Sequence, residues 1–71
     1  MNIFSERLKN ERKIKGLSQR AMASRLGISQ STYKGYELIG KANGREPSIE
    51  MIIKIATVLD IETDYLFGIK D

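Results

Sequence analysis

The spacing of apolar and polar residues along the chain predicts five helices and no strand. Phe4 and Leu8 lie one turn apart in the first segment, and most of the charged side chains there point the other way. Apolar residues recur every three or four positions in the later segments, which is the helical period. We therefore expect an all-α fold, with helices at about residues 2–15, 19–26, 30–38, 49–59 and 63–67. In the fourth helix the main apolar arc consists of Ile49, Ile52, Ile53, Ala56 and Leu59.

The second and third predicted helices are separated by a very short turn. Ser18 and Ser29 are well suited as N-caps, because a serine hydroxyl accepts from a backbone N–H that the first helical turn leaves unpaired. Gly27 lies between the two helices and can adopt the positive φ of a tight turn. Two capped helices around a glycine turn are the layout of a helix-turn-helix.

Composition limits the classes of protein to consider. A chain of 71 residues has room for one small domain, which we take as residues 1–71. It has no cysteine and no histidine, so it lacks disulfides, thiolate metal ligands and the commonest general base. We expect no metal, no cofactor and no enzymatic activity. It also has no apolar run of about 18 residues and no signal-peptide pattern, which favours the cytoplasm and no membrane association.

The charge is distributed unevenly. Residues 1–47 carry ten basic and four acidic side chains, whereas residues 48–71 carry two basic and five acidic ones. A basic half that contains the helix-turn-helix, followed by an acidic half, is suited to binding a polyanion on one side only. The alternative is that the basic residues of the first helix only keep that helix solvated.

One side of the third helix has the composition of a surface that reads DNA bases. At 100° per residue, Tyr33 and Tyr36 fall together, and we expect their rings to pack inward. The opposite side is polar or small. A glutamine can pair with an adenine edge, a lysine can donate to guanine, and hydroxyls can serve either base or phosphate. The candidate base-reading residues are Gln30, Ser31, Thr32, Lys34 and Gly35, the last of which permits close approach.

Residues around this surface are candidate phosphate contacts. Free N–H groups and the helix dipole suit the start of the second helix for a phosphate. Residues 39–46 contain two glycines and an asparagine, so they are predicted to form a loop, and its polar side chains could contact the DNA backbone. The candidate phosphate-contacting residues are Gln19, Arg20, Ser29, Lys41, Asn43 and Arg45. The alternative for each residue taken singly is an ordinary solvated side chain.

The runs RLKNERKIKGLSQRAMASRLGISQSTYKGYE and PSIEMIIKIATVLDIETDYLFG resemble the Cro and lambda-repressor-like (Xre-type) helix-turn-helix family. The resemblance covers nearly the whole chain. It implies five helices, with the second and third as the motif, and sequence-specific binding of a double-stranded operator, usually as a homodimer, to regulate transcription.

The resemblance also implies roles for single residues. Positions 30, 31 and 35 are usual base readers, and Gln19 is expected to contact phosphate and brace Gln30. Arg12 and Glu37 occupy positions of a partly buried ion pair between the first and third helices.

The chain departs from the family pattern at three places. Gly35 lacks the long side chain usual at its position. The segment from Glu37 to Pro47 is longer than usual, and it either adds contacts to the DNA backbone or has no role. Glu62 replaces the usual serine cap, so we expect the fifth helix to start at Thr63 or to fray.

Specific binding by so small a protein usually needs two half-sites about one DNA turn, roughly 34 Å, apart. We therefore expect a homodimer. The candidate dimer face includes Met51, Val58 and, at its edge, Ile55, which lie on the side of the fourth helix away from its main apolar arc. Tyr65 and Ile69 are expected to extend this face. The alternative is that these are scattered surface residues.

A different class of function is an antitoxin-type module that binds a partner toxin and regulates its own expression. A long flexible tail would favour this alternative, and this sequence lacks one. The 71 residues are either a complete short regulator or part of a longer repressor.

Overall fold

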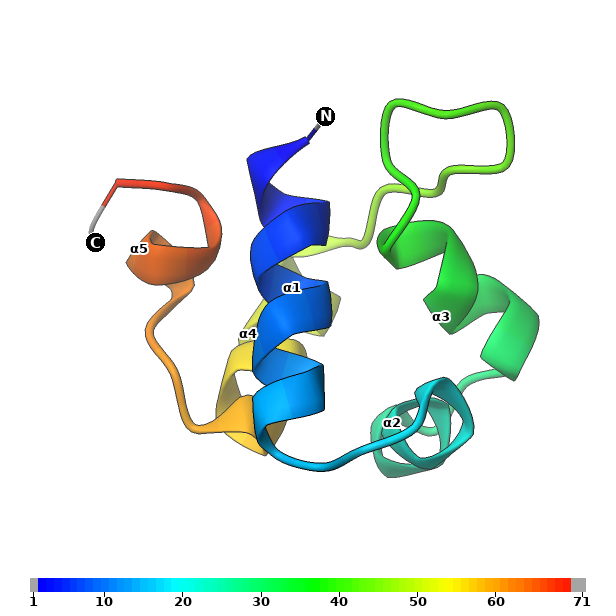
Figure 1. Cartoon of the computed structure of the whole chain (residues 1–71), viewed down its shortest axis with the longest axis horizontal. Helices are drawn as coiled ribbons and strands as arrows, with labels where there is room; N and C mark the ends of the chain where they lie inside the picture. Colours follow the sequence, from blue (N-terminus) through cyan, green and yellow to red (C-terminus); the bar gives the residue numbers. More distant parts are fainter. Residues whose placement is uncertain (1, 70–71) are drawn as a thin grey trace.

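The computed structural model describes residues 2–69, which form five helices and the turns between them (Figure 1). α2 and α3 lie side by side, and α1 is flanked by α5 (Figure 1). The helices are α1 (Ile3–Ile14), α2 (Gln19–Leu26), α3 (Gln30–Tyr36), α4 (Ile49–Leu59) and α5 (Thr63–Leu66). The all-α prediction and the number of helices in the described part of the chain are confirmed. No helix within residues 2–69 is long and apolar enough to cross a membrane.

Polar caps define where four of the helices begin. Asn2, Ser18, Ser29 and Ser48 each have extended backbone, and their side chains accept from the N–H three residues later. Gly27 follows α2 with a φ of 72°, the left-handed conformation predicted for the turn. α2 and α4 have the predicted bounds, and local caps mark both ends of α2 and the start of α4. α5 starts at Thr63, and Glu62 makes no side-chain cap hydrogen bond.

α3 ends two residues earlier than predicted. After Tyr36 the backbone turns tightly, because the N–H groups of Glu37 and Leu38 donate three residues back rather than four. The Ser5 hydroxyl from α1 then completes the termination. It donates to the Tyr36 carbonyl at 2.6 Å and accepts from the Ile39 N–H at 3.0 Å, so both groups have partners outside the helix. The prediction for α1 was one residue too long at each end, and the prediction for α5 was one residue too long at its C-terminal end.

The core lies where all five helices meet. The tyrosine rings of α3 point into it, as predicted, and Tyr33 is fully buried. The core side chains are Phe4, Leu8, Met22, Ala23, Leu26, Tyr33, Tyr36, Ile55, Ala56, Leu59 and Leu66. This core fixes the angle between α3 and the other helices, and thereby the direction in which the outer side of α3 points.

The predicted inner side of α4 needs a correction. Ile55 was assigned to the dimer face, but it is fully buried, with 0% exposure. Ile49 and Ile53 were assigned to the inner arc, but they are 75% and 55% exposed. The true inner face contains Ile55, Ala56 and Leu59 and is rotated from the predicted one. Apolar residues of several kinds cover more than half of the circumference of this helix, so the wheel does not indicate which part of that broad face α2 and α5 will cover.

Candidate nucleic-acid interface

The helix-turn-helix presents one polar surface to solvent. The side chains of Gln30, Ser31 and Lys34 are exposed on α3 and have no hydrogen-bond partner among residues 2–69. Thr32 is partly buried and differs from them. Its hydroxyl accepts from the Ser29 hydroxyl at 2.9 Å, so both side chains take part in capping α3. Three of the five candidate base-reading residues therefore have side chains that are free to bind.

The opposite side of α3 is held by aromatic packing. The Tyr33 and Tyr36 rings meet edge to face, with centroids 6.2 Å apart. Tyr33 extends its hydroxyl past the core to the Glu37 carboxylate, to which it donates. The ring that anchors α3 thus also has its polar end satisfied.

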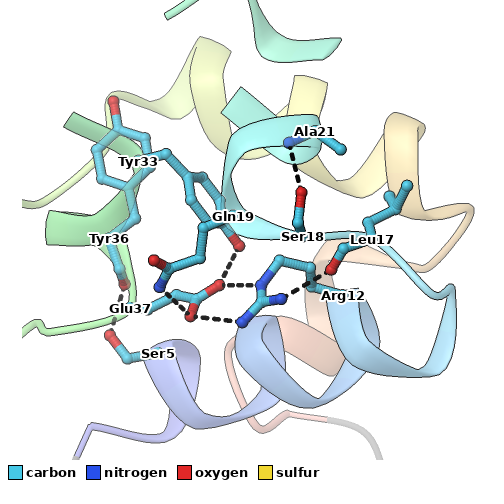
Figure 2. A network of polar contacts seen from close by, with 9 residues as sticks. All are labelled: Ser5, Arg12, Leu17, Ser18, Gln19, Ala21, Tyr33, Tyr36 and Glu37. Carbon is cyan, nitrogen blue, oxygen red and sulfur yellow. Dashed lines mark hydrogen bonds and ion pairs between the residues drawn. The ribbon is translucent and has the colours of Figure 1, made fainter. Parts of the chain in front are cut away.

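A buried carboxylate, Glu37, connects the first three helices (Figure 2). The Arg12 guanidinium donates to it through Nε at 2.6 Å and through Nη2 at 3.2 Å, and the two side chains are only 8% and 3% exposed. Gln19 donates its amide to the same carboxylate at 3.1 Å. Arg12 Nη1 also donates to the Leu17 carbonyl at 2.7 Å, at the start of the turn before α2. α1, α2 and α3 therefore meet at one ion pair.

The network shifts the ionisation of its members. Burial alone would raise the pKa of Glu37, but hydrogen bonds from Arg12, Tyr33 and Gln19 reverse that effect, so its pKa lies below the ordinary value. The hydrogen bond to Glu37 raises the pKa of Arg12. Burial, followed by the nearby carboxylate, raises the pKa of Tyr33 far above its ordinary range. The structure thus favours a charged pair and a neutral tyrosine at neutral pH.

Gln19 directs an amide N–H to Glu37, and no hydrogen bond joins it to Gln30 within residues 2–69. Arg20, next to it at the start of α2, is exposed. Lys54 donates from α4 to the Leu26 carbonyl at 2.9 Å, which ties down the turn between α2 and α3. Sequence reasoning gave no role to Lys54 or to Ser5, because their partners are backbone atoms distant in the sequence.

The long segment after α3 forms a wide arc beyond the end of that helix (Figure 1). Lys41, Asn43 and Arg45 are exposed along it. Gly35 is buried, and what covers it is the side chain of Arg45. A polar hollow lies between α3 and the arc, and its lining includes Ser31, Lys34, Asn43 and Arg45. Candidate base-reading and candidate phosphate-contacting residues therefore lie around the same hollow.

The remaining residues of the predicted dimer face do not form an open patch. Met51 and Val58 are partly buried and pack against the core. Tyr65 is partly buried, with the Arg7 guanidinium 4.4 Å from its ring centroid. Ile69 is 73% exposed. Of the five residues, Ile69 alone offers a largely uncovered apolar side chain.

Comparison with known proteins shows the family to which this helix-turn-helix belongs. A helix-turn-helix family model matches residues 8–66, and the chain belongs to this Xre/Cro-like family, whose members bind DNA. It is 45% identical over 64 residues to the Bacillus subtilis regulator YqaE, covering 90% of this chain and 52% of YqaE.

Two further relatives come from phages or prophages. The SPbeta prophage-derived regulator YonR of Bacillus subtilis is 45% identical to this chain, and the aligned region covers 90% of this chain and 56% of YonR. The transcriptional repressor RstR of a cryptic CTXphi phage in Vibrio cholerae is 41% identical to this chain, and the aligned region covers 92% of this chain and 54% of RstR. The chain spans about half the length of these relatives. No solved structure is significantly similar to it. Relatives named as transcriptional regulators agree with the prediction of a DNA-binding protein rather than an enzyme.

Proposed function

We propose that residues 1–71 form the DNA-binding domain of a transcriptional repressor that reads operator bases in the major groove with α3. The observation that carries the proposal is the division of α3 into two sides. Tyr33 and Tyr36 fix one side in the core, while Gln30, Ser31 and Lys34 project from the other with unused donors and acceptors. A short helix of this kind, held rigidly and polar outward, is suited to direct readout of base edges.

The charge distribution supports the same orientation. The basic residues concentrate in the half of the sequence that contains the helix-turn-helix, so the DNA phosphates would meet positive charge around α3. Arg20 and Lys41 lie on either side of the reading residues in the sequence and are exposed. Repression, rather than activation, is supported by the name of the phage relative RstR.

A homodimer on a palindromic operator completes the proposal, because one copy of α3 covers only one half-site. In place of the predicted dimer face, the proposal uses Ile49 and Ile53, two apolar side chains of α4 that remain exposed. Sedimentation of the chain with and without operator DNA measures whether two copies bind together. Two copies per duplex are expected, and one copy per duplex at saturation would contradict the dimer.

Selection from a randomised duplex library at about 150 mM salt, followed by sequencing, tests the function itself. Enrichment of a palindromic motif is the expected result, and the spacing of its halves would give the geometry of the dimer. Weak binding that depends on salt but enriches no motif would contradict sequence-specific readout. In that case a protein partner would become the better candidate.

A further inference from the structure

The outer side of α3 has a gap at Gly35, and a side chain from another segment fills it. A Cβ added at Gly35 would lie 2.8 Å from Cγ and 2.9 Å from Cβ of Arg45. Both distances are shorter than real contacts allow. The aliphatic stem of Arg45 therefore occupies the space that a side chain at position 35 would take.

Backbone contacts hold Arg45 in this place. Its N–H donates to the Gly35 carbonyl at 2.9 Å, which fixes the start of the side chain against α3. The residue before it, Gly44, crosses the end of α3 so closely that a Cβ there would lie 2.3 Å from the Leu38 carbonyl oxygen. Gly44 N–H also donates to the Lys41 carbonyl at 2.9 Å. The arc thus returns along a defined path, and glycines at 35 and 44 permit that path.

The guanidinium itself remains available. Arg45 is exposed, and no acceptor among residues 2–69 holds its N–H groups. Ser31 and Lys34, which project from α3, line the same hollow. An arginine fork can donate two parallel hydrogen bonds to O6 and N7 of guanine, which is the commonest specific contact in the major groove.

We propose that Arg45, carried by the long segment after α3, supplies the base-reading side chain that Gly35 lacks and recognises a guanine in the operator. This inference rests on the proposed function of α3. It differs from the sequence-based assignment of Arg45 to a phosphate, because the stem of Arg45 lies on the reading side of α3. It also gives the long segment a role in specificity.

The test is the duplex selection repeated with Arg45→Ala, Arg45→Lys and Lys41→Ala. The wild-type motif should contain a guanine that Arg45→Ala no longer prefers, with the other positions unchanged and affinity for the wild-type site about tenfold lower or more. Arg45→Lys keeps the charge but not the fork, so it should also lose much of that preference. Lys41→Ala, in the same arc, should weaken all sequences alike.

A second variant keeps Arg45 but displaces its side chain from α3. Gly35→Ala places a methyl group against the stem of Arg45, so it should lose the same guanine preference. Adding Arg45→Ala to it should cause little further loss. Thermal unfolding of each variant checks that the fold is retained, which is expected for Arg45→Ala because the backbone bond to Gly35 needs no side chain.

The outcomes separate the two proposals. A wild-type motif that Arg45→Ala weakens uniformly, without a change of sequence preference, would make Arg45 a phosphate contact and overturn this inference while leaving the proposed function standing. A wild-type chain that enriches no motif would overturn both.

Discussion

The two sides of α3 differ in whether their polar groups have hydrogen-bond partners within the protein. On the inner side, the Glu37 carboxylate accepts hydrogen bonds from Arg12, Gln19 and Tyr33, and among the described residues no buried side-chain N or O atom lacks a partner. On the outer side, Gln30 and Lys34 are solvated and unpaired. Satisfied polar groups fix a structure, whereas unsatisfied ones are available to a ligand. One side of this seven-residue helix therefore holds it in the core, and the other side is available to bind DNA. Substitutions on the inner side should change stability, and substitutions on the outer side should change DNA binding.

The largest expected effect is on the inner side. Arg12→Met leaves the Glu37 carboxylate buried without its cation, which should lower the free energy of unfolding by about 3 kcal/mol. This is the low end of the range for a broken buried pair, because Tyr33 and Gln19 still donate. Urea denaturation followed by circular dichroism measures it.

The matched control is Arg20→Met, an exposed arginine whose loss should change stability by less than about 0.5 kcal/mol. The double variant Arg12→Met, Glu37→Met should recover much of the loss, because no charge is then stranded. Equal, small effects of Arg12→Met and Arg20→Met would show that the buried pair does not hold the three helices together.

Low pH should weaken the hydrogen-bond network around Glu37, because it protonates the carboxylate. The pKa of Glu37 is lowered on folding, so its contribution to stability is complete above the ordinary carboxyl pKa of 4.5 and is lost as pH falls through the lowered value. Wild-type stability should therefore fall more steeply below that pH than the stability of Glu37→Gln. Urea midpoints across an acid series measure the difference. Parallel curves for the two proteins would contradict the role given to Glu37.

The outer side should respond in binding rather than in stability. Gln30→Ala removes an exposed side chain that makes no hydrogen bond or ion pair within the described residues, so the free energy of unfolding should change little. Discrimination at one base position should fall by about 1–3 kcal/mol. Ser24→Ala, an exposed change on α2, is the control. Competition binding with single-base variants of the operator measures both, and an unchanged preference would show that Gln30 does not read a base.

The difference between the two sides also explains what the sequence could predict. Both ends of α2 and the start of α4 follow from Ser18, Gly27 and Ser48, each of which acts within one turn of its own position. The burial of Tyr33 and Tyr36 follows from helical periodicity alone.

Non-local contacts are what the sequence did not reveal. α3 ends early because Ser5, more than thirty residues away, satisfies its last turn. The predicted inner side of α4 was wrong because the apolar face of this helix is broader than the part that packs, so only tertiary packing decides that Ile55 is covered. The placement of Arg45 depends on two glycines in different parts of the chain. Gly35 on α3 leaves room for the Arg45 side chain, and Gly44 in the loop lets the chain pass close to the backbone of Leu38 and Ile39. In the sequence each of those glycines is only a missing side chain.

The smallest effect is expected in the arc after α3. Lys41→Ala should lower affinity for all sequences alike and reduce the slope of log affinity against log salt by about 0.9, the value for one released counterion. Asn43→Ala, a neutral change in the same arc, should leave the slope unaltered. Titrations at several salt concentrations measure both. A slope unchanged by Lys41→Ala would mean that the arc stands clear of the phosphates, and Arg45 would then have to reach its base without a neighbouring contact to the DNA backbone.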